Sequence, residues 1–215
     1  MIENNDNEET EGAVTPEDRR LADAPCSVFR FSREWAMPSS DTLSIPPITE
    51  FVDRWIAPVC VDPFARDCKL ACITNDLNPD TDAEHHMDVY DFALWLREQG
   101  ISPRSIIFDP PYSARQAADC YQAIGVDPET LKAVRERKGN SGTRTGSGWS
   151  IERDALSRIQ QVGDVCMSFG WESNGMGKKR GYFIEEILMV AHGAGRHDTI
   201  CVAERKMSDQ PDFFL

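Results

Sequence analysis

The chain has 215 residues, of which 40 % are hydrophobic and 9 % aromatic, a composition that suits a globular protein with one sizeable core. No apolar run approaches the roughly 18 residues of a membrane span, and the N-terminus is acidic where a signal peptide would be basic, so we expect a cytoplasmic protein without membrane association. The formal net charge of −13 argues against a uniformly basic, nucleic-acid-binding surface and makes the distribution of charge along the chain informative.

Residues 1–23 hold much of the negative charge. They carry eight acidic residues against Arg19 and Arg20, which is a net charge of −6, and almost no large apolar side chain. Such a segment cannot bury enough apolar surface to offset the entropy cost of ordering it. We therefore predict a disordered acidic tail over 1–23 and a single folded domain over 24–215.

The rest of the chain alternates helices with short apolar strands. Residues 28–46 contain three prolines and are expected to be irregular, with one short strand. The spacing of apolar residues and the positions of Pro and Gly predict the other elements. These are, in chain order, a helix from Pro47 to before Pro58, strands over 59–64 and 70–74, a helix from Val89 to before Gly100, a strand over 105–108, helices over 113–124 and 151–161, a strand over 164–169, and two final runs over 185–192 and 198–204.

Several of these strands are apolar throughout, which is typical of parallel strands that are buried on both faces. Their alternation with helices predicts an α/β, doubly wound, mostly parallel sheet, and the last two runs resemble an antiparallel hairpin. Ligands of such sheets bind at the carboxyl ends of the strands. The polar residues that close the strands are therefore candidates for a binding site: Asp62, Asp76, Asp109 and Trp171.

The segment 125–150 differs from its surroundings in being rich in Gly, Ser and basic residues. We predict a flexible basic loop there. Its basic residues are Lys132, Arg135, Arg137, Lys138 and Arg144.

Seven cysteines form an odd set without a C-x-x-C pair, so we expect buried free thiols and no disulfide framework. Cys60, Cys68, Cys72, His85 and His86 lie close in sequence, but their spacing matches no zinc pattern. We therefore predict no metal.

The stretch Phe108-Asp109-Pro110-Pro111-Tyr112 ends one of the predicted strands and carries a specific chemistry. An exocyclic amine on a nucleobase is a poor nucleophile, because its lone pair is delocalised into the ring. A carboxylate from Asp109 and the backbone carbonyl of Pro110, held in direction by the prolines, would accept both amine hydrogens and localise that lone pair. Tyr112 offers a ring face on which an extruded base can stack. In the alternative interpretation Asp109 caps the next helix and Tyr112 packs on the surface.

This motif resembles that of the amino-methyltransferases with the Asp-Pro-Pro-Tyr motif, in particular small phage-borne DNA adenine-N6 methyltransferases. The resemblance covers most of residues 33–206. It implies S-adenosylmethionine as the cofactor, DNA as the partner, methyl transfer to adenine N6 after base flipping, and a Rossmann-like class I methyltransferase fold. We accordingly expect a seven-stranded sheet with helices on both faces, in a monomer or a homodimer.

The same resemblance assigns the cofactor site to the segment 33–42, to the ends of the first two predicted strands and to the start of the next helix. Many relatives have a glycine-rich turn after the first strand, whereas here Arg66 follows Ala65. This arginine would either meet the carboxylate of the cofactor or face solvent. The implied cofactor-binding residues are Met37, Asp41, Thr42, Asp62, Phe64, Ala65, Asp76, Leu77, Asp88 and Val89.

Nucleic-acid contacts are expected from basic residues that follow the catalytic motif, and the segment 125–150 is the candidate for choosing the target sequence. A solvated surface is the alternative interpretation of each basic run. The implied residues are Arg135, Arg137, Lys138, Arg144, Trp171, Lys178, Lys179 and Arg180. Two other functions stay open at this point: methylation of cytosine N4 or of RNA, and a non-catalytic methyltransferase-like binding protein.

Overall fold

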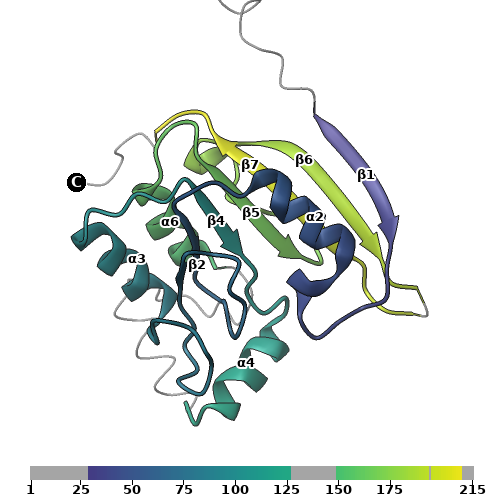
Figure 1. Cartoon of the computed structure of the whole chain (residues 1–215), viewed down its shortest axis with the longest axis horizontal. Helices are drawn as coiled ribbons and strands as arrows, with labels where there is room; N and C mark the ends of the chain where they lie inside the picture. Colours follow the sequence, from purple (N-terminus) through teal and green to yellow (C-terminus); the bar gives the residue numbers. More distant parts are fainter. Residues whose placement is uncertain (1–28, 127–148, 194, 210–215) are drawn as a thin grey trace, which may run out of the picture.

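The computed structural model describes residues 29–126, 149–193 and 195–209, which form one sheet with helices on both faces (Figure 1). The strands are β1 (Arg30–Trp35), β2 (Cys60–Asp62), β3 (Ile73–Thr74), β4 (Ser105–Phe108), β5 (Val165–Gly170), β6 (Tyr182–Ala191) and β7 (Thr199–Lys206). Their order in the sheet is β1-β6-β7-β5-β4-β2-β3. Every neighbouring pair is parallel except the two pairs of β7, which runs antiparallel to β5 and β6.

The helices are α2 (Pro46–Trp55), α3 (Val89–Glu98), α4 (Ala114–Ala123) and α6 (Ser150–Ile159), with short 3-10 helices η1 (Thr42–Ser44) and η2 (Lys178–Arg180). Helix α2 packs on one face of the sheet, and α3 and α6 pack on the other. Helix α4 lies beyond the carboxyl end of β4 (Figure 1). No helix in the described part of the chain has the length and apolar content needed to cross a membrane.

The four buried residues of β4 show why the sheet is covered on both faces. Ile107 belongs to the core that includes Phe51 of α2. Ile106 and Phe108 point the other way and join the core that includes Leu96 of α3. A strand that serves two cores has no polar face, which explains its continuous apolar run. The predicted α/β, Rossmann-like, mostly parallel seven-stranded sheet with a final antiparallel hairpin is confirmed.

Most predicted elements occur where the sequence placed them, and the differences are local. The second short strand is only two residues long, whereas a five-residue run was predicted. The region 28–46 contributes β1, which pairs with β6 at the edge of the sheet and has exposed residues at five of its six positions. The predicted acidic tail and the span 127–148 of the predicted basic loop lie outside the described residues. The extent of the single domain therefore stays a prediction.

The expectation of buried thiols holds for only part of the set. Cys60, Cys166 and Cys201 are buried in the sheet, whereas Cys72 and Cys120 are exposed. The exposed pair follows from position, since Cys72 precedes the short β3 and Cys120 lies on α4, which does not pack on the sheet. Within the described ranges, no three His, Cys, Asp or Glu side chains group as metal ligands would.

Buried polar contacts attach the C-terminal hairpin to both helical layers. Glu186 of β6 accepts hydrogen bonds from Arg54 Nη2 at 2.7 Å and from Trp55 Nε1 at 2.8 Å, both on α2. On the other side, Lys206 Nζ donates to the carbonyl oxygens of Ser157 of α6 and of Gln160, which directly follows the helix, at 3.0 and 2.7 Å. Because an unpaired buried charge is costly, these contacts favour one position of the hairpin between α2 and α6.

The packing of α2 gives a direct stability test. Phe51 is fully buried and its ring meets Phe169 of β5 edge to face, with centroids 6.1 Å apart. Phe51→Ala should lower the free energy of unfolding by about 3–5 kcal/mol, because it leaves a cavity in the core. The matched control is Phe31→Ala on β1, where 59 % of the side chain is exposed and the cost should stay within about 0.5 kcal/mol. Urea unfolding measures both, and equal losses would contradict the assignment of α2 to the core.

Candidate active site

The loops that follow β2, β3 and β4 enclose a cavity of about 510 Å³. Helix α4 forms one wall. Phe64 forms another, since its ring packs against Phe108 and Trp149 with centroid separations of 5.4 and 5.1 Å. The volume lies in the usual range of small-molecule sites, and the position at the carboxyl ends of parallel strands is where such sites occur in doubly wound sheets.

Most of the residues that the sequence placed in the site meet at this cavity. All four residues of the predicted catalytic motif line it: Asp109, Pro110, Pro111 and Tyr112. Six predicted cofactor residues also line it: Thr42, Phe64, Asp76, Leu77, Asp88 and Val89. The fold therefore brings five separate segments, spread over 70 residues of sequence, to one cavity.

Four predicted cofactor residues do not line the cavity: Met37, Asp41, Asp62 and Ala65. The Met37 side chain is 68 % exposed. Asp41 is also exposed and caps η1, where its Oδ1 accepts the N–H of Leu43 at 3.2 Å. Asp62 is buried in the end of β2 and accepts the N–H of Phe64 at 2.9 Å. Asp41 and Asp62 thus hold the backbone of their own turns, and contact of these four residues with a cofactor stays a prediction.

Two acids on the cavity wall also fix the backbone around it. Asp76 accepts the N–H of Asn78 at 2.8 Å through Oδ1 and the N–H of Arg66 at 3.1 Å through Oδ2. Asp88 accepts the N–H of Tyr90 at 2.9 Å and so caps α3. Each carboxylate therefore holds a turn of the backbone and also lines the cavity.

Asn75 organises this region, although its only signal in the sequence is its place after a predicted strand. Its fully buried amide donates to the carbonyl oxygens of Pro63 and Met87, at 3.2 and 2.9 Å. Its Oδ1 accepts the N–H of Met87 at 3.1 Å. One side chain thus joins the loop after β2 to the segment that leads into α3.

Sequence reasoning also missed the wall that α4 provides. Gln116 and Cys120 line the cavity one helical turn apart, and Ile124 follows at the next turn. This spacing was present in the sequence, but the mixed polarity of the helix gave no reason to expect that it faces a cavity. Trp149 was missed because it ends the segment that was predicted to be a loop.

Asp109 is half-buried at the end of β4, and the hydroxyl groups of Tyr112 and Thr42 lie close to it. Tyr112 donates its hydroxyl hydrogen to Asp109 Oδ1 at 2.7 Å, and the Tyr112 oxygen lies 3.0 Å from Thr42 Oγ1. Burial raises the pKa of Asp109 to about 6, although these hydroxyl groups and the charge of Arg66 act in the opposite direction. The carboxyl group is therefore ionised at pH 8 and protonated at pH 4.

A second buried carboxyl group lies at the end of the neighbouring strand. Burial raises the pKa of Asp62 well above its usual range, and the negative charges of Asp109 and Asp76 raise it further. Acids that disfavour each other's ionisation create a region of negative potential. A positive charge brought into the cavity would relieve that repulsion, so the site favours a cationic ligand.

The hydroxyl group and the ring of Tyr112 both contact neighbouring side chains. Burial raises the pKa of its hydroxyl, which therefore stays protonated and donates to Asp109. Trp171, at the end of β5, meets the Tyr112 ring edge-on, with centroids 5.8 Å apart. His197 in turn packs on Trp171 at 4.2 Å. Together these rings form an aromatic cluster beside the catalytic motif, on the side of the β6–β7 loop.

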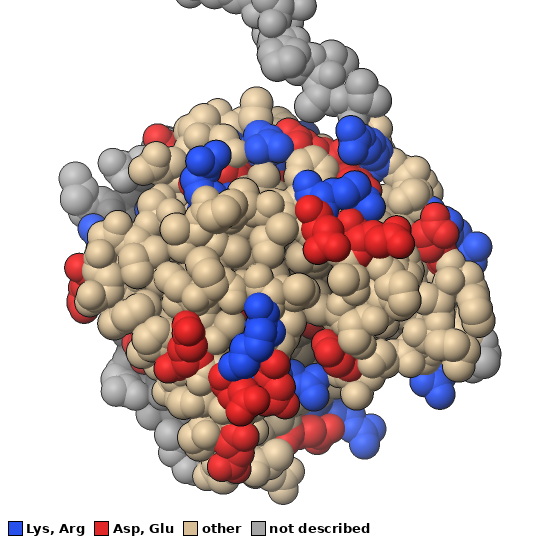
Figure 2. All heavy atoms as spheres, viewed as in Figure 1, with Lys and Arg blue, Asp and Glu red and all other residues tan. Residues whose placement is uncertain are grey.

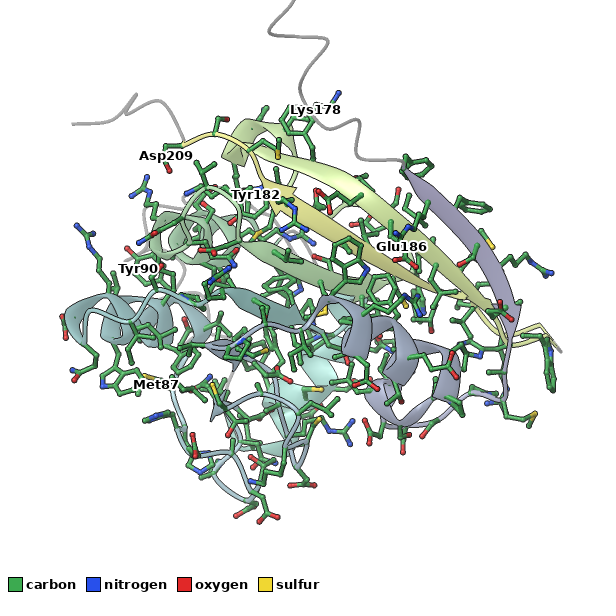
Figure 3. All side chains as sticks on the ribbon, turned by 45° about the horizontal axis from the view of Figure 1, so that its top comes forward. Met87, Tyr90, Lys178, Tyr182, Glu186 and Asp209 are labelled. Atoms are coloured by element: carbon green, nitrogen blue, oxygen red, sulfur yellow. The ribbon has the colours of Figure 1, made fainter. Side chains whose placement is uncertain are left out.

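The three basic residues of η2 lie far from the cavity. They precede β6, which runs in the same direction as β4 and β5. They therefore lie at the amino ends of these strands, whereas the cavity lies at the carboxyl end of β4. Figure 3 shows Lys178 at the other end of the molecule from Met87, whose neighbour Asp88 lines the cavity. Arg180 binds internally to Asp154 Oδ1 at 2.6 Å. The structure thus places Lys178, Lys179 and Arg180 away from the cavity, and their expected contact with nucleic acid stays a prediction. Arg135, Arg137, Lys138 and Arg144 lie outside the described residues.

No protein-family model matches the sequence, and no curated protein matches it. Among solved structures, the chain is similar to SMU.776, described as a methyltransferase and complexed with S-adenosylhomocysteine, with a TM-score of 0.39 and 13 % identity over 68 % of this chain and 44 % of that one. A structure described as a methyltransferase dependent on S-adenosylmethionine from Streptococcus mutans gives a TM-score of 0.39 and 12 % identity over 67 % and 44 %. The chain thus matches less than half of each, and this likeness does not define its family.

The pKa of Asp109 predicts how stability depends on pH. A carboxyl group whose pKa is raised to about 6 in the folded protein stabilises it below pH 4, and that contribution is lost as pH rises through 6. Asp109→Asn removes the ionised group, so the variant should match the wild type near pH 4 and exceed it by about 3 kcal/mol at pH 8. Chemical denaturation at both pH values measures this difference. The exposed Asp80→Asn serves as control, and a gain that is independent of pH would contradict the assignment.

Proposed function

We propose that the protein transfers a methyl group from S-adenosylmethionine to the exocyclic amine of a nucleobase, namely adenine N6 in DNA. The observation that carries this proposal is the position of the Asp109-Pro110-Pro111-Tyr112 turn. It ends β4 and lines the same cavity as the strand-end acid Asp76 and the helix cap Asp88. The turn that would bind the amine thus lines a cavity large enough for a nucleoside.

The residues of the cavity fit this cofactor. Phe64, Leu77 and Val89 supply apolar surface suited to an adenine ring, and the carboxylates of Asp76 and Asp88 suit ribose hydroxyl and amine groups. The sulfonium and ammonium groups of the cofactor are cations, which the crowded acids favour. When bound, the cofactor supplies an electrophilic methyl group.

The catalytic turn prepares the amine for attack. The carboxylate of Asp109 accepts one amine hydrogen and the Pro110 carbonyl accepts the other, so the lone pair is directed away from the ring of the base. Asp109, with a pKa of about 6, then takes the proton that the methylated amine loses. Before an amine binds, the Tyr112 hydroxyl must release Asp109, which frees the ring to stack on the base. No covalent bond to the protein forms.

The surface charge favours one direction of approach for a nucleic acid. Acidic side chains gather over the loops that follow β2 and β3 (Figure 2), and these loops carry the exposed acids Asp67, Asp80, Asp82 and Glu84. A polyanion is repelled there. In our proposal the strand approaches over Trp171 and His197, where aromatic rings can stack on bases, and the target base is flipped toward Asp109. Arg135, Arg137, Lys138 and Arg144 remain proposed phosphate or base contacts.

Product analysis tests this function. Unmethylated DNA is incubated with the protein and methyl-labelled S-adenosylmethionine, digested to nucleosides and examined by mass spectrometry. We expect label in N6-methyldeoxyadenosine, no label with Asp109→Ala, and unchanged labelling with the exposed control Asp80→Ala. The Asp109→Ala variant should still bind the cofactor in calorimetry. Label only in cytosine or in RNA would reassign the substrate, and turnover by Asp109→Ala would refute the mechanism.

Tyr112→Phe separates the hydroxyl from the ring. The hydrogen bond from Tyr112 favours the ionised form of Asp109, so its loss should raise the pKa of Asp109 above about 6. If Asp109 acts ionised, the acidic limb of the pH profile of kcat/KM moves to higher pH, while the stacking ring keeps the rate at pH 9 within about tenfold of the wild type. A profile that does not move would contradict the link between Tyr112 and Asp109.

A further inference from the structure

Arg66 is the one Lys or Arg among the described residues that line the cavity. The ionisable partners around it are acidic, since Asp76, Asp88 and Asp109 line the same space and Asp62 is buried at the adjoining strand end. A basic side chain at this position therefore changes the charge of an otherwise negative cavity.

The backbone of Arg66 is held in a conformation that glycine adopts more easily. Its φ angle is +52°, in the left-handed region, and its N–H donates to Asp76 Oδ2 at 3.1 Å. The N–H of Ala65 before it donates to the carbonyl oxygen of Asn75 at 2.9 Å. The loop thus keeps the shape of a glycine turn although it carries a long cationic side chain.

The guanidinium group is held by one hydrogen bond and has further N–H donors for a ligand. Its Nη1 donates to the carbonyl oxygen of Ser40 at 2.7 Å, which joins the loop after β2 to the segment before η1. A guanidinium group has five N–H donors, and no second hydrogen bond from this side chain reaches any residue in the described ranges. It also affects Asp109 electrostatically, so it lies toward the catalytic end of the cavity.

The charges of the proposed cofactor match this arrangement. S-adenosylmethionine has two cationic groups, which the acids favour, and one carboxylate, which the same acids repel. A carboxylate that enters a cavity lined by carboxylates needs a cationic partner, and the described lining offers Arg66 alone. We propose that Arg66 binds the α-carboxylate of the methionine moiety and thereby selects for the intact amino acid end of the cofactor; this inference rests on the proposed function.

The anchored position of Arg66 suits it to this role. The contact to Ser40 holds the guanidinium in place, so little side-chain freedom remains to be lost when a carboxylate binds. Arginine presents paired N–H groups that match the two oxygens of a carboxylate, whereas lysine provides a single ammonium group. Lysine at this position should therefore restore only part of the effect.

A comparison of two ligands isolates this contact. Calorimetry measures binding of S-adenosylhomocysteine and of S-adenosyl-3-thiopropylamine, the same molecule without its carboxylate, to the full-length protein. The wild type should bind the first about 10- to 100-fold more tightly, as expected for a charge-assisted pair. Arg66→Gly should bind both ligands within about threefold of each other, and Arg66→Lys should be intermediate. Lys69→Ala, on the same loop but outside the cavity lining, should keep the wild-type preference.

The variants also separate recognition from folding. Arg66→Gly relieves the left-handed φ, so its thermal midpoint should equal or exceed that of the wild type. An equal loss of affinity for both ligands in Arg66→Gly would overturn the proposal, because a structural role weakens them alike. A wild type that does not distinguish the ligands overturns it as well. If the wild type binds neither ligand, the proposed function itself fails.

Discussion

Two carboxyl groups lie at the carboxyl ends of the neighbouring parallel strands β2 and β4: that of Asp62 is buried and that of Asp109 is half-buried. Burial raises both pKa values, and the charge of Asp109 raises that of Asp62 further, so the folded protein carries a region that is costly to ionise and favourable for a cation. The surrounding structure maintains this arrangement: β4 is apolar on both faces, and Asn75 fixes the loops beside β2. Function and stability are therefore opposed at this position, as in many active sites.

The sequence predicted the sheet well because its signals were physical and local. Continuous apolar runs such as Ser105–Phe108 correspond to strands that serve two cores, and the turn after them had to lie at the edge where ligands bind. Because ligands of such sheets bind at the carboxyl ends of the strands, we expected Asp76 and Asp109 at one site. Both line the cavity, although 33 positions separate them in the sequence. The motif and the fold thus gave the same prediction independently.

Other features depend on tertiary contacts that no local pattern contains. The wall formed by Gln116 and Cys120 depends on where α4 lies after β4. The hydrogen bond from the Tyr112 hydroxyl group to Asp109 depends on the side-chain conformation of Tyr112. The basic run at Lys178 follows the catalytic motif in sequence. It precedes β6, which runs in the same direction as β5, so it lies at the amino ends of these strands and away from the catalytic motif. Proximity in sequence was a poor guide at that point.

The central claim is that the buried acids form a site for a cationic methyl donor. Calorimetry of S-adenosylmethionine binding near pH 6, in buffers of different ionisation enthalpy, tests it directly by counting protons. A cation that binds beside Asp109 lowers its pKa, so binding should release protons, with less release for the uncharged sulfur of S-adenosylhomocysteine and less in Asp109→Asn. Binding without proton release, or equal release in Asp109→Asn, would contradict the account.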